Sequence, residues 1–300
     1  MRVGLAGCGR WGRLILRDLI SLGAEVAVAD ILEAKRADSL MIGAVSTHDG
    51  IEALPAVDAY VVAVPTVLHS HALEALIPRG RPIFVEKPMT CNTDDAARIV
   101  TMAPDRVFCM DKWRYHGGVL KLAGLAKSGA LGEVLSVRSW RLGWGNPHDD
   151  VDATWILAPH DLSIAYEILG FLPGVRAAFG LSSDPIGTSL TGLLQDNEGG
   201  PSAVMEISTS HPVNRRSVVV IGTEGVAQFG DSYDSVVRVN RPGKEPEEMP
   251  VSTEMPLLAE LRAFLEHVKG GPPPKSSAAE AALFVRRIAE MRAIAGFEGA

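Results

Sequence analysis

The chain has 300 residues, a length that suits two domains of ordinary size. Its composition is 47% hydrophobic and 22% charged, as in globular proteins, which excludes a disordered or fibrous chain. The 29 Lys and Arg residues are outnumbered by 36 Asp and Glu residues, so the formal net charge is −7. Because a protein that binds nucleic acid through its phosphates is usually basic, we expect no nucleic-acid partner.

The first residues lack the pattern of a signal peptide, and the longest apolar run falls far short of the ~20 residues that a membrane span needs. The three cysteines, Cys8, Cys91 and Cys109, are too few and too scattered for a disulfide framework or a CxxC metal site. We therefore expect a cytoplasmic protein with no membrane partner.

Short apolar runs alternate with helical patterns through the first 110 residues. Apolar strands separated by helices indicate a parallel sheet covered on both faces, which is a doubly wound α/β domain. The predicted strands are residues 2–6, 25–30, 59–64, 82–85 and 106–110, and the predicted helices are 11–22, 68–76 and 94–102.

Beyond about Lys112 the predicted strands follow one another with turns between them. This pattern favours a large, mostly antiparallel sheet, so the second half is predicted to be a second α/β domain. Strands are predicted at 133–142, 175–181, 189–194, 202–209, 217–222 and 235–239, and helices at 119–128, 161–169, 257–268 and 278–295. The predicted domains are residues 1–115 and 116–300.

A glycine-rich motif, GCGRWG at residues 7–12, follows the first predicted strand and opens the first helix. In this context the first glycine allows a tight turn, the second lets a pyrophosphate approach the backbone, and the third permits close helix–strand packing. Asp30 ends the second strand, where a carboxylate can bind the adenosine ribose hydroxyls of NAD. Lys35 and Arg36 are near enough in the sequence to leave NADP open as an alternative. The predicted dinucleotide-binding residues are Gly7, Gly9, Arg10, Trp11, Gly12 and Asp30.

A lysine stands at the carboxyl end of the strand at 82–85, in the sequence Glu86-Lys87-Pro88. Ligands of open α/β sheets bind at that edge, and Pro88 restricts Lys87 to an extended backbone. A lysine beside a nicotinamide can pass a proton to or from a substrate oxygen, which makes Lys87 a candidate general acid/base.

Further motifs follow in a specific order and spacing. They are Pro65-Thr66 with His69, Arg114-Tyr115, GALGEV at 129–134 and GTEG at 222–225. With the glycine loop and Glu86-Lys87-Pro88, they make nearly the whole chain resemble the Gfo/Idh/MocA family of nicotinamide-dependent oxidoreductases.

The resemblance implies a Rossmann domain followed by a substrate-binding and oligomerisation domain whose open sheet often forms the interface of a homodimer or homotetramer. It implies a substrate that is a sugar, a nucleotide sugar, a cyclitol or a related polyol. Lys87 falls on the family's catalytic lysine, and Pro65, Thr66, His69, Glu86 and Lys87 join the glycine loop and Asp30 as cofactor-binding positions.

The chain departs from the family at one motif. Members commonly carry Asp-x-x-x-His on a helix of the second domain, whereas here Ile156 stands four residues before His160. Isoleucine cannot orient an imidazole. Either Lys87 and His160 manage the proton alone, or Asp152 or Asp161 substitutes, or the chemistry is changed or lost.

The cluster of His148, Asp149, Asp150 and Asp152 lacks the spacing of a metal site, so no metal is predicted. The loop at 144–150 is expected to be solvated or to face substrate. The sequence thus predicts an NAD(P)-dependent oxidoreductase that moves a hydride between nicotinamide and a secondary alcohol or ketone. One alternative is a reductase of imines or enones, or a redox-neutral member; another is a dinucleotide-binding protein without catalysis. The predicted catalytic residues are Lys87 and His160, and the predicted substrate contacts are Arg114, Tyr115, Trp144 and His160.

Overall fold

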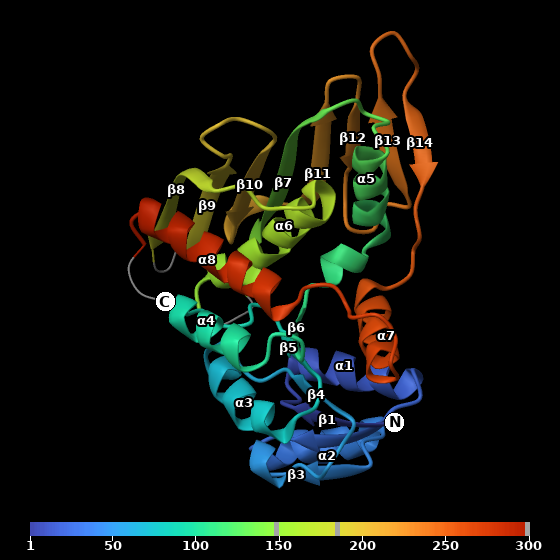
Figure 1. Ribbon diagram of the computed structural model, residues 1–300, viewed down its shortest axis with the longest axis vertical. Coiled ribbons are helices and arrows are strands. Elements are labelled where there is room, and N and C mark those ends of the chain that lie inside the picture. Colours follow the sequence, from blue (N-terminus) through green and yellow to red (C-terminus); the bar gives the residue numbers. More distant parts are fainter. Residues whose placement is uncertain (147–149, 184–186, 298–300) are drawn as a thin grey trace. The chain divides into compact units, whose positions relative to one another are not determined.

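The computed structural model describes residues 1–146, 150–183 and 187–297 (Figure 1). The chain forms two compact units. Unit 1 comprises Met1–Asp111 and Leu257–Val285, and unit 2 comprises Lys112–Pro256 and the chain from Arg286 onward. The sequence placed one boundary after residue 115, whereas in the structure the chain returns to unit 1 near its end.

Unit 1 is built on a six-stranded parallel sheet with the strand order β3-β2-β1-β4-β5-β6. The order reverses between β1 and β4, and such a switch point is where open α/β sheets bind ligands. This confirms the predicted doubly wound Rossmann sheet. Its strands are β1 (Arg2–Ala6), β2 (Glu25–Ala29), β3 (Ser46–His48), β4 (Ala59–Val62), β5 (Ile83–Glu86) and β6 (Val107–Met110), and its helices include α1 (Arg10–Ser21), α2 (Glu33–Ile42), α3 (His69–Leu76), α4 (Thr93–Met102) and α7 (Pro256–Val268).

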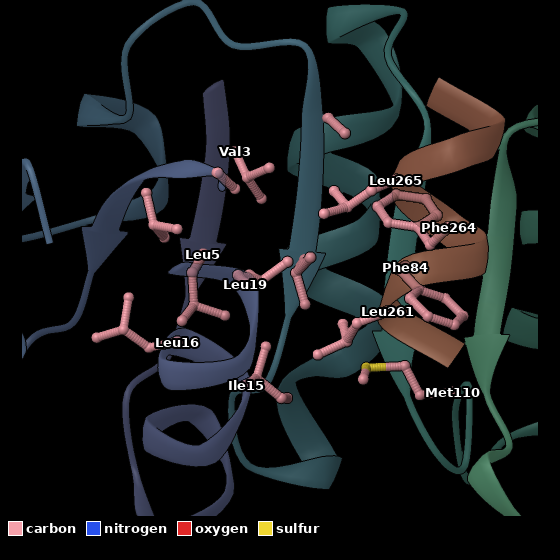
Figure 2. Packing of buried hydrophobic residues seen from close by; sticks show 14 of the residues in the cluster. Val3, Leu5, Ile15, Leu16, Leu19, Phe84, Met110, Leu261, Phe264 and Leu265 are labelled. Carbon is pink, nitrogen blue, oxygen red and sulfur yellow. The ribbon is translucent and has the colours of Figure 1, made fainter. Parts of the chain in front are cut away.

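The return of the chain to unit 1 has a packing reason. Helix α7 buries Leu261 and Phe264 against the face of the sheet that carries Phe84, and the two phenylalanine rings stack with their centroids 4.8 Å apart (Figure 2). Burial of one such side chain contributes about 1.5–3 kcal/mol. The helix therefore belongs to the core of unit 1, although its sequence lies far from the other elements of that unit.

Unit 2 contains an eight-stranded sheet in the order β14-β13-β12-β11-β7-β10-β9-β8. All neighbouring strands pair antiparallel except β7 and β10, which pair parallel. The predicted large, mostly antiparallel sheet is confirmed. The strands are β7 (Val134–Trp144), β8 (Val175–Ser183), β9 (Gly187–Leu194), β10 (Ser202–Ser208), β11 (Ser210–Gly222), β12 (Val226–Phe229), β13 (Val236–Asn240) and β14 (Glu247–Pro250), with α5 (Gly117–Lys127), α6 (Ala153–Leu169) and the end of α8 (Ala278–Ile294).

Some predicted boundaries were wrong for identifiable reasons. Helix α6 begins at Ala153 and not at the predicted residue 161, and it continues through Pro159. The Asp152 side chain accepts a hydrogen bond of 2.8 Å from the Thr154 amide, which caps this earlier start. Helix α2 and strands β3, β12 and β14 were not predicted, because they are short or mostly exposed and carry weak periodicity. In the part of the chain that the structure describes, no helix has the length and apolar character to cross a membrane.

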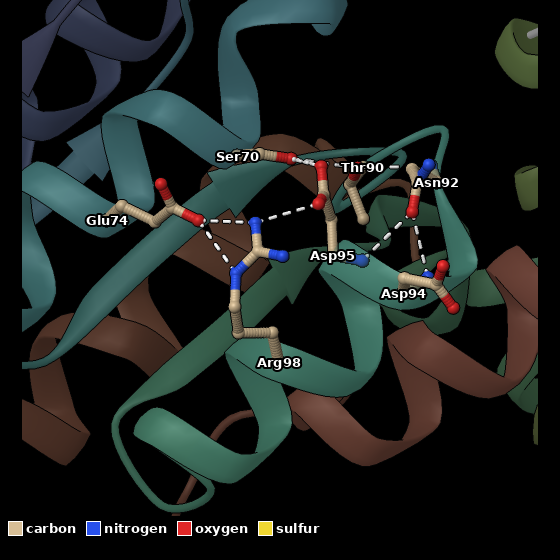
Figure 3. A network of polar contacts seen from close by, with 7 residues as sticks. All are labelled: Ser70, Glu74, Thr90, Asn92, Asp94, Asp95 and Arg98. Atoms are coloured by element: carbon tan, nitrogen blue, oxygen red, sulfur yellow. Dashed lines mark hydrogen bonds and ion pairs between the residues drawn. The ribbon is translucent and has the colours of Figure 1, made fainter.

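Helix α4 begins a few residues after Lys87, and a side chain caps its first turn. The Asn92 side chain accepts hydrogen bonds from the amides of Asp94 and Asp95, at 2.8 and 3.0 Å. In the same network Arg98 lies between Asp95 and Glu74 (Figure 3).

Replacing Asn92 by Ala is expected to destabilise unit 1 by about 1 kcal/mol, because two amides of the first turn lose their acceptor. Urea unfolding followed by circular dichroism measures the change. Thr93→Ala, at an exposed position of the same turn, is the matched control and should cost less than about 0.5 kcal/mol. Equal stability of the two variants would contradict the capping role.

Candidate functional site

The glycine loop between β1 and α1 has the geometry of a phosphate cradle. Gly7 has φ +88°, and a Cβ there would lie 2.6 Å from the Ala63 carbonyl oxygen. A Cβ on Gly12 would collide with the Gly7 carbonyl oxygen, whereas the space beside Gly9 is open except for the Lys35 Nζ, 3.8 Å from the Cβ position. Gly9 is also the N-cap of α1 and makes no side-chain cap, so the helix presents backbone amides at the open side. These features fit a dinucleotide diphosphate.

Asp30 connects this loop to the end of β2. Its carboxylate is 8% exposed and accepts the Cys8 amide at 2.8 Å through Oδ2 and the Leu32 amide at 3.0 Å through Oδ1. Each carboxylate oxygen has a second lone pair for a ribose hydroxyl. Arg36 donates to the Asp30 and Ile31 carbonyl oxygens at 2.8 and 3.1 Å, so its guanidinium lies beside the same turn.

Cys8 and Arg10 lie within the cradle. Burial raises the pKa of the Cys8 thiol, so this cysteine stays protonated and is a poor nucleophile. Arg10 is exposed at the first residue of α1. The amides of the loop, rather than its side chains, therefore provide the shape of the cradle.

The loops after β4 and β5 are joined by His69. This side chain is 1% exposed, with Nδ1 2.7 Å from the Pro88 carbonyl oxygen and Nε2 3.1 Å from the Val64 carbonyl oxygen. Thr66 is buried and Pro65 is exposed at the start of the short helical turn Thr66–Leu68. His69 thus holds the loop that carries Pro65 against the loop that follows Lys87.

Glu86, Lys87 and Pro88 end β5 at the carboxyl edge of the sheet. The Lys87–Pro88 peptide bond is cis, and Lys87 is partly exposed. The Trp11 indole Nε1 donates to Glu86 Oε1, and the Lys87 amide donates to Glu86 Oε2 at 3.1 Å. Glu86 therefore links the first turn of α1 to the backbone of Lys87, and the cofactor-binding residues predicted from the sequence gather at one edge of unit 1.

His160 lies on α6 in unit 2, where the Trp113 ring meets it edge-on with ring centroids 6.5 Å apart. Ile156 is 3% exposed one turn earlier on the same helix. The two carboxylates considered as substitutes are both engaged. Asp161 pairs with Arg141 at 2.7 Å with both side chains buried, and Asp152 caps α6 and pairs with Arg292.

The remaining predicted substrate contacts also belong to unit 2. Arg114 is 6% exposed, donates to Glu167 at 2.9 Å and lies over the Tyr166 ring. Tyr115 ends the helical turn Lys112–Tyr115, and Trp144 is 75% exposed at the end of β7.

In the loop at 144–150, residues 147–149, including His148 and Asp149, lie outside the described residues. Among the residues that are described, no group of three or more His, Cys, Asp or Glu side chains could hold a metal ion.

Two buried carboxylates of unit 1 were missed by sequence reasoning. Asp111 follows β6 and Glu260 lies on α7, and each is 1% exposed. For Glu260 a signal exists, since it shares the apolar side of α7 with Leu257 and Phe264. Asp111 has no such local signal, because its burial depends on the sheet.

Comparisons with known proteins find similarity to oxidoreductases. Residues 1–108 match the Gfo/Idh/MocA family model, described as an oxidoreductase family with an NAD-binding Rossmann fold. The dTDP-3,4-didehydro-2,6-dideoxy-alpha-D-glucose 3-reductase of Streptomyces violaceoruber is 26% identical over 299 residues, covering 90% of this chain and 85% of that protein. The inositol 2-dehydrogenase of Arthrobacter sp. (strain FB24) is 36% identical over 146 residues, which is 45% of this chain and 43% of that protein.

Solved structures share the fold along the whole chain. The UDP-N-acetylglucosamine 3-dehydrogenase of Acidithiobacillus ferrooxidans superposes with a TM-score of 0.85 at 20% identity, covering 99% of this chain and 98% of that one. Levoglucosan dehydrogenase in complex with NADH gives 0.87 at 15% identity, with 99% and 97% covered. With the glycine cradle and the Glu86-Lys87-Pro88 edge, these findings show that residues 1–108 match the NAD-binding Rossmann fold of the Gfo/Idh/MocA oxidoreductase family, and that the fold of the whole chain is shared with sugar dehydrogenases.

Proposed function

We propose that this protein transfers a hydride between NAD and a secondary alcohol or ketone of a sugar, a nucleotide sugar or a cyclitol-like substrate. The observation that carries this proposal is the placement of Lys87 at the same sheet edge as the glycine cradle, connected to it through Glu86 and Trp11. The named activities of the relatives, a dTDP-sugar 3-reductase and inositol 2-dehydrogenases, support the substrate class.

The residues of unit 1 that would hold NAD follow from their geometry. The amides around Gly9 would receive the diphosphate, and the Asp30 carboxylate would receive the adenosine ribose hydroxyls. NAD supplies the site that accepts or donates the hydride. Lys87 would hold the proton at its Nζ and exchange it with the substrate oxygen, while Pro88 keeps the lysine backbone extended.

Unit 2 would contribute the groups that orient the substrate. His160 is proposed to position or relay the proton, and Arg114, Tyr115 and Trp144 are proposed to contact substrate hydroxyls or rings. Because Glu167 already holds the Arg114 guanidinium, Arg114 would act from a fixed position.

The cofactor preference is proposed to be NAD over NADP. Asp30 would repel a 2′-phosphate, while Lys35 and Arg36 lie close enough to leave weaker NADP binding open. Calorimetric titrations with NAD, NADH and NADP test this, followed by absorbance of reduced nicotinamide across a panel of polyols and keto sugars. No heat with any of the dinucleotides would overturn the proposal.

One observation favours a second candidate function, which is dinucleotide binding without catalysis or with altered chemistry. Ile156 cannot support His160, and the nearby carboxylates of Asp152 and Asp161 are engaged in their own ion pairs. Tight NAD binding with no absorbance change on any substrate of the panel would favour this candidate.

We also propose that the large sheet of unit 2 forms a homodimer or homotetramer. Phe179 and Leu181 are 68% and 54% exposed, and alternation along β8 places both on one face, opposite the face on which Ala178 is buried. Light scattering is expected to give the molar mass of a dimer or tetramer. Phe179→Glu is expected to lower that molar mass toward the value of the monomer. The matched control is Phe171→Glu, at an exposed position outside the sheet. A wild-type chain that scatters as a monomer would contradict this role.

A further inference from the structure

Two arginines stand directly opposite each other in the sheet of unit 2. Strands β7 and β11 pair antiparallel, and the regular part of their pairing sets Arg141 opposite Arg216. Side chains of directly opposite residues point to the same face of a sheet, with Cβ atoms about 4.5–5.5 Å apart. Val218 and Val220, at alternate positions from Arg216, are buried in the core that α5 and α6 share with the sheet. Both arginine side chains therefore lie on the face that the helices cover.

The charge of Arg141 is compensated by an acid on α6. Its Nε donates to Asp161 Oδ2 at 2.7 Å, and both side chains are buried. The Arg141 guanidinium also lies over the Trp113 ring, with Cζ 4.6 Å from the ring centroid. The other neighbour of this ring is His160, which it meets edge-on. Arg141 is therefore a paired and fixed cation, one ring away from the residue that is proposed to position or relay the proton.

Arg216 is half-buried and has no acid of its own. Among the residues that the structure describes, none forms a hydrogen bond or an ion pair with its guanidinium. Burial lowers the pKa of Arg216 and the positive charge of Arg141 lowers it further, whereas the negative charge of Asp161 raises it. Arginine nevertheless stays protonated in proteins. Because a half-buried cation without a partner is costly, the position is suited to an anion that arrives with a ligand.

The loop between β12 and β13 carries the remaining acid that acts on Arg216. The negative charges of Asp231 and of the Tyr233 phenolate raise the pKa of Arg216. The Asp231 carboxylate is held within its own loop, where Oδ1 accepts hydrogen bonds from the Tyr233 amide at 3.2 Å and the Ser232 hydroxyl at 3.4 Å. Asp231 therefore acts on Arg216 from a distance and does not pair with it.

We propose that Arg216 binds an oxyanion of the substrate, a carboxylate or a phosphate, with Arg141 as the fixed second cation beside it. This inference rests on the proposed function and narrows its substrate class to sugar acids, sugar phosphates and nucleotide sugars, to the exclusion of neutral cyclitols. A guanidinium offers parallel N–H donors that match the oxygen atoms of a carboxylate or phosphate. The bound anion would also offset the repulsion between the two opposed arginines.

The test is calorimetric titration of the whole protein, with and without NADH, with three probes. D-glucose is neutral, D-glucuronate carries a carboxylate, and UDP-glucose carries a diphosphate. We expect an anionic probe to bind at least roughly tenfold more tightly than glucose, and Arg216→Met to remove this difference. A difference that appears with glucuronate identifies a carboxylate as the anion, and one that appears with UDP-glucose identifies a diphosphate.

Arg215→Met is the matched control, because it removes the same group from the neighbouring residue. Arg215 points to the opposite face of the sheet, where its guanidinium lies over the Trp140 ring with Cζ 4.2 Å from the centroid. This variant should keep the wild-type preference for the anionic probe. Arg216→Lys retains the charge but not the planar fork of donors, so it should keep part of the preference.

The outcome separates anion binding from a purely structural role. A wild-type protein that does not distinguish the charged probes from glucose overturns the proposal, and so does an Arg216→Met variant that melts earlier but keeps the wild-type preference. Should Arg216→Met fail to fold, Arg216→Gln decides the question by the same comparison. All residues of this argument lie in unit 2, so a protein that fails to bind NAD can still pass or fail this test without cofactor.

Discussion

Replacing Lys87 by Met is expected to lower turnover by roughly 10²–10⁴-fold while leaving the affinity for NAD nearly unchanged. Methionine keeps the length and apolar stem of the side chain but can neither give nor take a proton. The Lys87 amide and its bond to Glu86 remain, and Glu86 keeps its bond from Trp11 beside the glycine cradle. Absorbance of reduced nicotinamide measures the turnover, and calorimetry measures the affinity.

Lys127→Met, at an exposed position on α5, is the matched control for the loss of an ammonium group and should leave both quantities unchanged. Turnover of Lys87→Met within a few-fold of wild type would show that another group exchanges the proton. His160 of unit 2 would then be the next residue to test.

Replacing Gly12 by Ala is expected to weaken NAD binding by roughly ten- to hundredfold, which corresponds to about 1–3 kcal/mol of misfit. The added methyl collides with the Gly7 carbonyl oxygen, so the first turn of α1 must move away from β1. That movement shifts the amides that would hold the diphosphate. Calorimetric titration with NADH gives the dissociation constant, and circular dichroism confirms that the variant is folded.

Gly124→Ala is the matched control, because Gly124 lies in α5 with no atom within 4 Å of its Cβ position. The exchange should leave NADH binding intact and stabilise the helix by about 0.5–1 kcal/mol. If Gly12→Ala binds NADH as tightly as Gly124→Ala, the loop at 7–12 is not the phosphate cradle.

Features that depend on residues close together in the sequence could be predicted from it. The strand, the GCGRWG loop and the helix that follows are contiguous, and glycine is required there by local backbone geometry, which the structure reproduces in the positive φ of Gly7. The alternation of apolar runs and helices likewise indicated the parallel sheet, since the strand faces are buried by the helices next to them in sequence.

Features that depend on contacts between residues far apart in the sequence could not be predicted from it. Helix α7 completes the core of unit 1 from more than a hundred residues beyond β6, and whether it would cover that sheet depends on complementary packing. In the same way, the burial of Asp111 and Glu260 follows from strand register and helix packing. The motifs thus indicated a dinucleotide fold and its lysine because local backbone rules encode them, whereas the covering of the sheet by α7 and the burial of Asp111 emerged from long-range packing, for which a single sequence carries no local signal.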